Sequence, residues 1–213
     1  MCNLTVLDTL RCPIHGVISV LGDGCINVNY KFMMSQREDR LEWLKYIQRE
    51  FKEHNINSTI WFRRTGGFPN SRPSFVLQTQ RYLLFKSERE RWYPTGKKQL
   101  PLDIRITPKS LAHFYMGDGS LVQYQLRLYT DAFSLEEVRY LRSRIDDLYE
   151  IPFYIRSKPN GRYFLEITRK KLVQYFLALI KPYILSCFSY KCVPGTRYYR
   201  KDSSRPFYVR ILE

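Results

Sequence analysis

The sequence has few acidic residues, few cysteines and no long apolar segment, and each shortage excludes a class of protein. Its 20 Asp and Glu residues stand against 35 Lys and Arg residues, a net charge of +15 over 213 residues. The five cysteines are odd in number and scattered, so a disulfide framework is not expected. The most apolar stretch, Val173 to Leu185, is interrupted by Gln174, Lys181 and Pro182, so it does not suit a membrane span. We therefore expect no membrane partner.

The N-terminal residues also lack the pattern of a targeting segment. They have no basic start followed by an apolar core, as a signal peptide would, and acidic Asp8 is unusual for a transit peptide. We therefore expect neither a secretion signal nor a targeting peptide, and the expected location depends on where the gene lies. The expected location is the mitochondrial or chloroplast matrix if the gene is organellar, and otherwise the cytoplasm if it is bacterial or phage.

The excess of positive charge predicts a polyanionic partner, because binding to phosphates releases condensed counterions. Arginine outnumbers lysine, and arginine makes bidentate contacts to phosphate and to guanine. A basic enzyme with an unrelated substrate is the alternative interpretation. Because the basic residues are spread along the whole chain, we favour a nucleic acid.

A short acidic motif occurs twice, as Asp23-Gly24 and Asp118-Gly119, each time at the end of an apolar run. Glycine suits the C-terminal end of a helix, so each run is predicted to be a helix that ends at the motif. A carboxylate is disfavoured there by the helix dipole, and it is costly in an apolar setting unless something uses it. Two such carboxylates suggest a pair that converges on a metal. The alternative is that both are ordinary helix-end residues.

Glycine precedes each of these aspartates, at Gly22 and Gly117, and small residues permit two helices to approach closely. Close approach would bring Asp23 and Asp118 together, and divalent cations would offset their repulsion. Mg²⁺ prefers carboxylate, water and phosphate oxygens as ligands. We therefore predict a site for two or three Mg²⁺ ions and include Gly22 and Gly117 in it.

The chain also repeats itself with an offset of 95 residues, which relates Asp23 to Asp118 and Ile60 to Ile155. Each half is predicted to be helix, two strands, helix, two strands, helix, and therefore of the α+β class. In the second half, Ser134 and Glu137 form the capping-box pattern of a helix start. The strand-like and helical segments are 26–35, 38–54, 58–64, 74–80 and 81–92 in the first half, and 123–130, 134–149, 153–158, 162–168 and 170–185 in the second.

Both halves end in the pattern Lys-x-x-Pro, which begins at Lys98 in the first half and at Lys191 in the second. The segment that follows Lys98 has paired prolines and few apolar residues, which is typical of a linker. We assign residues 1–100 to the first half, 101–109 to the linker and 110–213 to the second half with a basic C-terminal tail.

The two motifs and their repeat resemble the LAGLIDADG homing endonucleases in their single-chain, two-motif form. The second motif reads LAHFYMGDG and keeps the family's Leu, Ala, Asp and Gly, whereas the first reads GVISVLGDG and keeps the terminal Asp and Gly. The sequence FYMGDGS is similar to the subgroup encoded in group I introns. The resemblance covers about residues 14 to 200.

This resemblance implies two pseudo-symmetric αββαββα halves whose sheets form a saddle over double-stranded DNA, with the motif helices packed at the centre. It implies metal-dependent hydrolysis of both strands of a long site, pseudo-palindromic or asymmetric, by a monomer. Asp23 and Asp118 match the catalytic metal ligands, and Lys98 and Lys191 match the central basic residue of each half. Such a lysine can stabilise charge on the phosphate.

Alternating polar residues are expected to form the DNA-reading faces of the strands, since Gln can read adenine and Arg guanine. The polar residues of the two halves fall on opposite parity under the 95-residue offset, so we expect a one-residue slip or bulge there. Basic residues around the hairpins are expected to contact phosphates or the groove. The complete predicted set is Asn27, Asn29, Lys31, Arg63, Arg64 and Arg72, with Gln123, Gln125, Arg127, Tyr129, Arg156, Lys158 and Arg162.

Two other functions fit the same resemblance. An RNA-binding maturase of this fold would assist the splicing of its own intron, and a transcription regulator would keep the saddle but lose the chemistry. Both motif aspartates are retained, which favours cleavage and argues against the regulator.

Overall fold

The computed structural model describes residues 19–64 and 73–194. The first part of the first motif run, Arg72 and the basic C-terminal tail lie outside these ranges. The described chain divides into two compact units, one up to Gly117 and one from Asp118 onward. Within the described residues no helix is long and apolar enough to cross a membrane.

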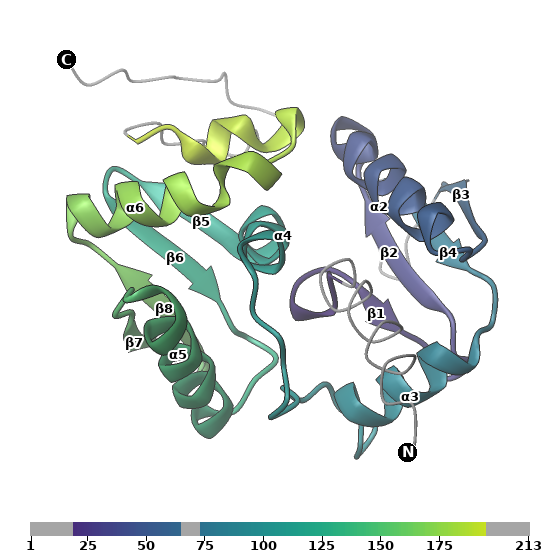
Figure 1. Cartoon of the computed structure of the whole chain (residues 1–213), viewed down its shortest axis with the longest axis horizontal. Coiled ribbons are helices and arrows are strands. Elements are labelled where there is room, and N and C mark those ends of the chain that lie inside the picture. The colour runs from purple at the N-terminus through teal and green to yellow at the C-terminus, as the bar shows by residue number, and fades with distance from the viewer. Residues whose placement is uncertain (1–18, 65–72, 195–213) are drawn as a thin grey trace, which may run out of the picture. The chain divides into compact units, whose positions relative to one another are not determined.

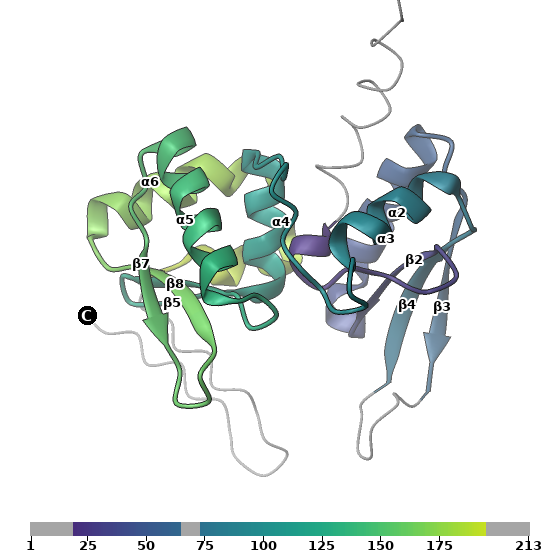
Figure 2. The same cartoon turned by 90° about the horizontal axis from the view of Figure 1, so that it is seen from below.

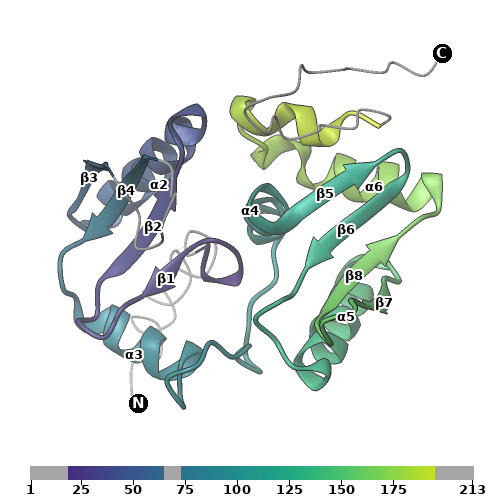
Figure 3. The same cartoon turned by 180° about the vertical axis from the view of Figure 1, so that it is seen from behind.

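The first unit contains a four-stranded antiparallel sheet with the strand order β1-β2-β4-β3. Helix α2 lies along one face of this sheet, in front of it in Figure 1 and behind it in Figure 3. The elements are η1 (Ser19–Leu21), β1 (Cys25–Ile26), β2 (Phe32–Gln36), η2 (Glu38–Arg40), α2 (Leu41–Glu53), β3 (Ser58–Arg63), β4 (Ser74–Thr79), α3 (Leu83–Trp92) and α4 (Pro108–Asp118).

The core of the first unit forms because α2 is strongly amphipathic. Its buried residues Trp43, Leu44, Ile47 and Phe51 follow the spacing of one helix face. Phe51 packs edge-on against Phe32 of β2, with ring centroids 5.2 Å apart. Aromatic pairs of this kind contribute beyond the area that they bury.

The second unit repeats this architecture, with the strand order β5-β6-β8-β7. Figure 2 shows α5 and α6 on one side of the β7–β8 hairpin. The predicted capping box is confirmed, because the Ser134 hydroxyl accepts from the Glu137 amide and the Glu137 carboxylate accepts from the Ser134 amide. The elements are β5 (Gly119–Val122), β6 (Gln125–Tyr129), α5 (Leu135–Tyr149), β7 (Tyr154–Ser157), β8 (Tyr163–Ile167), α6 (Lys170–Ile180), η3 (Lys181–Tyr183) and η4 (Ser186–Cys192).

The strand registers confirm the internal repeat and its predicted slip. Ile60 pairs with Leu77, and Ile155, 95 residues after Ile60, pairs with Leu165 at the equivalent position. Leu77 also pairs with Met34, whereas Leu165 pairs with Leu128, which lies 94 residues after Met34. Between the equivalent pairs Ile26–Phe32 and Leu121–Leu126, the first half therefore has five residues and the second has four, a difference of one.

The turn of the first β-hairpin occupies residues 27–31 of the segment predicted as a strand at 26–35, and the turn of its counterpart occupies residues 123–124 at the start of the segment predicted at 123–130. In the first half, Asn27 lies in the turn, and its side-chain oxygen accepts from the backbone amides of Asn29 and Lys31. In the second half the turn is Gln123-Tyr124, and Gln123 adopts a φ of 56°. The prediction that Asn27, Asn29 and Lys31 share one strand face is therefore wrong, because the asparagine side chain stabilises a turn instead.

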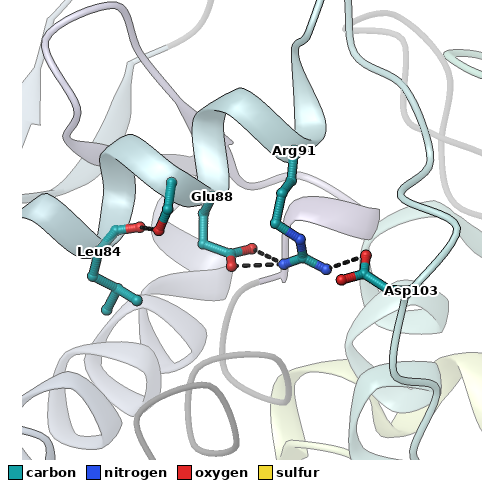
Figure 4. A network of polar contacts seen from close by, with 5 residues as sticks. Leu84, Glu88, Arg91 and Asp103 are labelled. Atoms are coloured by element: carbon teal, nitrogen blue, oxygen red, sulfur yellow. Dashed lines mark hydrogen bonds and ion pairs between the residues drawn. The ribbon is translucent and has the colours of Figure 1, made fainter. Parts of the chain in front are cut away.

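The connection from α3 to α4 is anchored by an arginine (Figure 4). Arg91 donates to both carboxylate oxygens of Glu88, at 2.6 and 2.7 Å, and to Asp103 at 2.5 Å. Glu88 is buried, so this bond supplies the partner that a buried carboxylate requires. The predicted linker segment is thus tied to α3.

Helix α4 packs in the first unit, so the compact units do not divide where the sequence repeat does. Its Lys109 forms an ion pair with Glu50 of α2, and its His113 lies edge-on to the rings of Trp43 and Tyr46. This helix carries the second motif, and it ends at Asp118 as predicted.

Candidate metal site and nucleic-acid interface

Asp23 lies just after the short helix η1 and exposes its carboxylate. Gln36, at the end of β2, donates from Nε2 to Oδ2 of Asp23 at 2.7 Å. Gln36 is itself only 5% exposed, so its side chain has little freedom to turn away. A rigid strand therefore fixes the orientation of this carboxylate.

Gly117, the residue before the second motif aspartate, lies directly against Asp23. A Cβ atom placed at Gly117 would be 3.4 Å from both Cγ and Oδ2 of Asp23. This is ordinary contact distance for one carbon atom, and a branched side chain would need more room. The absence of a side chain at Gly117 thus keeps one side of the Asp23 carboxylate open.

Lys98 reaches the same region from within the α3–α4 connection. Its Nζ donates to the backbone oxygen of Gly22 at 2.9 Å. Gly22 is the residue immediately before Asp23, so the ammonium binds the backbone of the first motif. The lysine singled out from the repeat is therefore held beside the first motif.

The second unit contains a similar arrangement around its own motif. Lys191, on η4, donates from Nζ to the backbone oxygen of Gly119 at 2.8 Å. Gly119 begins β5 directly after Asp118, whose side chain is partly exposed. The two lysines differ by one detail, since Lys98 binds the carbonyl before its aspartate and Lys191 the carbonyl after.

These groups fit Mg²⁺ in their chemistry. The ion commonly uses one or two protein carboxylates and completes its shell with water and substrate phosphate oxygens. In the first unit Asp23 offers an exposed carboxylate in a fixed orientation. In the second unit, taken by itself, Asp118 offers a partly exposed carboxylate at the end of α4. In the described ranges no three His, Cys, Asp or Glu side chains gather as a dedicated metal cage.

The face of the first sheet away from α2, toward the viewer in Figure 3, carries the polar residues Ser35 and Arg63. Arg63 lies across it and donates from Nη2 to the Ser35 hydroxyl at 3.0 Å, while Arg64, after the strand, is exposed. Trp61 is on the same face and is 41% exposed. Sequence reasoning missed this tryptophan, although its alternation with Arg63 along β3 was a usable signal.

The open face of the second sheet carries three of the four residues predicted for its first hairpin. Gln125, Arg127 and Tyr129 alternate with buried Leu126 and Leu128 along β6, as the sequence pattern predicted. Gln123 is not on this face, because it lies in the turn.

The basic residues of the second hairpin extend this face. Arg156 is on β7, and Lys158 follows that strand and donates to both oxygens of Asp131 at 2.5 and 2.8 Å. Arg162 is exposed just after the turn that contains Gly161, whose φ is +74°. These three residues therefore lie along one hairpin, as expected.

A family model described as "LAGLIDADG DNA endonuclease family" matches residues 15–175. The chain belongs to the LAGLIDADG DNA endonuclease family. This family assignment agrees with the two motifs and with the two antiparallel sheets.

Relatives of this LAGLIDADG protein carry different names. "Uncharacterized protein MJ1098" of Methanocaldococcus jannaschii is 36% identical over 198 residues, which are 86% of this chain and 75% of that protein. "Cytochrome b mRNA maturase bI2" of Debaryomyces hansenii is 31% identical over 54% of this chain, which spans 45% of that relative. "Intron-encoded endonuclease ai4" of Dictyostelium discoideum is 31% identical over 56% of this chain and 76% of its own length.

Among solved structures, the LAGLIDADG chain is similar in fold to the homing endonuclease I-WcaI bound to its DNA recognition sequence. The TM-score is 0.72 and the sequence identity 21%, over 92% of this chain and 95% of that one. This likeness establishes the mixed helix and antiparallel-sheet fold for the chain.

Proposed function

We propose that this protein is a site-specific endonuclease that hydrolyses both strands of double-stranded DNA. The observation that carries the proposal is the exposed Asp23 carboxylate, oriented by Gln36 and adjoined by Lys98. A carboxylate without a ligand would gain little from such a fixed orientation. A metal ligand gains directly, because groups behind a ligand tune its orientation and affinity.

In this proposal Asp23 and Asp118 hold divalent cations, with Mg²⁺ as the natural candidate. The cations would supply a nucleophilic water and offset charge on the scissile phosphate. Gln36 keeps the Asp23 oxygens in place, and Gly117 leaves room beside that carboxylate for the phosphate and its water. Gly22 belongs to the same proposed site by sequence. Lys98 and Lys191 stabilise the negative charge that builds on the phosphoryl group.

The open faces of the two sheets are proposed to bind the DNA. Arg127 and Gln125 on β6 are suited to base edges in the major groove. Arg63, Arg64, Arg156, Lys158 and Arg162 are suited to phosphates, and Arg72 belongs to the same set by sequence. The net charge of +15 supports a polyanionic partner of this kind.

The decisive experiment compares cleavage with binding in the variants Asp23→Asn and Asp118→Asn. Each should abolish double-strand cleavage while leaving specific binding largely intact, because the carboxylate holds metal and does not read bases. Cleavage would be measured on a DNA site selected from a random duplex library, and binding by titration of the same DNA with Ca²⁺ in place of Mg²⁺.

A matched control is Asp39→Asn, which removes an exposed carboxylate that pairs with Arg37 at 3.5 Å. It should cleave as the wild type does. Cleavage by the wild type in excess chelator would contradict the metal role, and undiminished cleavage by Asp23→Asn would contradict the site.

The alternative function is an RNA-binding maturase that assists the splicing of a group I intron. It is favoured by one specific observation, the similarity to the maturase of Debaryomyces hansenii. A splicing assay with the intron that surrounds the gene would test it. Splicing stimulated equally by the wild type and by Asp23→Asn would support a maturase activity separate from cleavage.

A further inference from the structure

A buried carboxylate lies in the middle of the proposed DNA-reading face of the second sheet. Glu166 is on β8, where it pairs in register with Arg127 of β6 on one side and Tyr154 of β7 on the other. It is 6% exposed. A negative charge is unexpected on a surface that is proposed to approach phosphates. The side chains that bind this carboxylate indicate its role.

Two arginines from the two flanking strands share this carboxylate. Arg127 donates from Nε to one oxygen at 2.8 Å, and Arg156 donates from Nε to the other at 3.2 Å. Arg127 also donates from Nη2 to Oε1 of Gln125 at 3.2 Å. The glutamate thus bridges the sheet from β6 to β7.

Aromatic rings support both guanidinium groups. The Arg127 guanidinium lies 5.3 Å from the ring centre of Phe164, and that of Arg156 lies 5.5 Å from the ring centre of Tyr154. Cation–π contact at this distance adds to the restriction of each side chain. The bond to Glu166 also raises the pKa of Arg127 above its usual value.

The use of Nε matters for recognition. An arginine held at Nε keeps N–H groups on both terminal nitrogens, and in Arg127 one N–H of Nη2 is shared with Gln125. The remaining terminal N–H groups match the O6 and N7 atoms of guanine. A flexible arginine loses side-chain entropy when it binds, and one that is already fixed loses less. The two arginines and Glu166 together carry one net positive charge instead of two, which lowers their electrostatic attraction to DNA of any sequence.

We propose that Glu166 is a positioning residue for base recognition, which fixes Arg127 and Arg156 so that their terminal nitrogens read a few base pairs of one half-site. This inference rests on the proposed DNA-binding function. Glu166 contributes specificity by orienting the arginines and by limiting their non-specific affinity.

The test is Glu166→Gln, which keeps the shape of the side chain but removes its charge and one of its two acceptor oxygens. A preferred duplex would first be selected with the wild type from a random library, and every single-base variant of it would then be titrated. Discrimination should fall by roughly tenfold to a hundredfold at a few adjacent positions. Affinity for an unrelated duplex should stay the same or rise a few-fold.

Arg127→Ala and Arg156→Ala identify which positions these should be. The base pairs at which these two variants lose discrimination should be the same ones at which Glu166→Gln loses it. At the base pairs that Arg127 reads, the double variant Glu166→Gln with Arg127→Ala should lose little more discrimination than Arg127→Ala alone. The matched control is Asp131→Asn, which removes a carboxylate bound to Lys158 in the same unit. It should leave the base preferences unchanged.

If Glu166→Gln does not fold, Arg127→Lys and Arg156→Lys test the same geometry, because lysine keeps the charge but has no side-on Nε bond. They should lose base preference and keep non-specific affinity. If the wild type discriminates between bases and Glu166→Gln, or the lysine variants, show the same base preferences, the positioning role alone is overturned. A wild type with no base preference would overturn the proposed function and this role together.

Discussion

Gln36 is a polar residue on the covered face of β2, where Phe32 and Met34 are apolar and buried. A buried amide needs a partner, and here the partner is the Asp23 carboxylate. At the scale of single residues, this bond connects the sheet to the motif. It is also short and charge-assisted, which makes it one of the stronger kinds of hydrogen bond.

Gln36→Met should therefore slow DNA cleavage without weakening DNA binding. Methionine fills a similar volume but donates no hydrogen bond, so the Asp23 carboxylate loses its fixed orientation. Loss of such a supporting bond typically costs about tenfold to a hundredfold in activity or metal affinity. Single-turnover cleavage at several Mg²⁺ concentrations measures it. The control Gln48→Met removes a bond to the Ser58 carbonyl and should cleave normally, and an unchanged rate in Gln36→Met would disprove the orienting role.

The buried His113 on α4 is expected to make the stability of the protein depend on pH. Burial first, and then the charge of Lys109, lower its pKa from 6.5 to about 3, although Glu50 opposes this. Burial alone would raise the pKa of Glu50, but the bond and charge of Lys109 hold it below its usual value. His113 is thus neutral in the folded protein near neutral pH.

The pKa of His113 is lower in the folded than in the unfolded state. Neutral His113 therefore makes its full contribution to the free energy of unfolding above about pH 6.5, and this contribution declines as the pH falls toward 3. His113→Gln should remove this part of the acid sensitivity. Its free energy of unfolding should fall less than that of the wild type between about pH 7.5 and about pH 4.5. Urea titrations across that range measure the difference, and parallel curves would show that His113 is not the group responsible.

At the scale of elements, the end of α4 is limited by the space beside Asp23. Gly117→Ala should fold, because its Cβ meets Asp23 at an ordinary contact distance of 3.4 Å and alanine favours a helix over glycine. Its cleavage should be slower than that of the wild type, because the methyl group takes up space beside the carboxylate. Gly117→Val should displace the carboxylate, lower the unfolding free energy by about 1–3 kcal/mol and abolish cleavage. Thermal unfolding and cleavage assays on both variants test this. Equal behaviour of the two would mean that the contact is not restrictive.

The elements with a strong local signal were predicted well from the sequence. The capping box at Ser134 fixes the start of α5, and the alternation around Leu126 and Leu128 fixes the inner face of β6. The turn after Ile26 was not predicted, because the polar residues Asn27, Asn29 and Lys31 occupy every second position, as the polar residues of a strand do. The competing bonds of the Asn27 side chain decide for a turn, and they depend on local geometry that alternation does not encode.

Gln36 and Glu166 were not singled out from the sequence for a different reason. Their partners are 13 and 39 residues away, and each contact depends on which strands pair and in which register. A polar residue in an apolar strand is a visible signal, but it does not name its partner. The lysines at 98 and 191 were found because the repeat itself marks them.

At the scale of the whole molecule, two motifs and two equivalent sheets lie in one chain. A symmetric duplex site is normally matched by two copies of one binding unit, and this chain contains both. One chain should therefore bind one DNA site. Analytical ultracentrifugation of the protein with its selected duplex should give a mass of one chain per duplex, whereas two chains per duplex at all concentrations would exclude this stoichiometry.

The longer turn between β1 and β2 has a practical consequence for engineering. A strand from one half can replace its counterpart in the other only if the two are aligned correctly. The equivalent residues of β2 and β6 are 94 positions apart, as for Met34 and Leu128, although the motifs are 95 apart. A chimera aligned on the motifs would turn every side chain of the transplanted strand to the opposite face. Chimeras that exchange β2 for β6 therefore have to be aligned by strand register and not by motif.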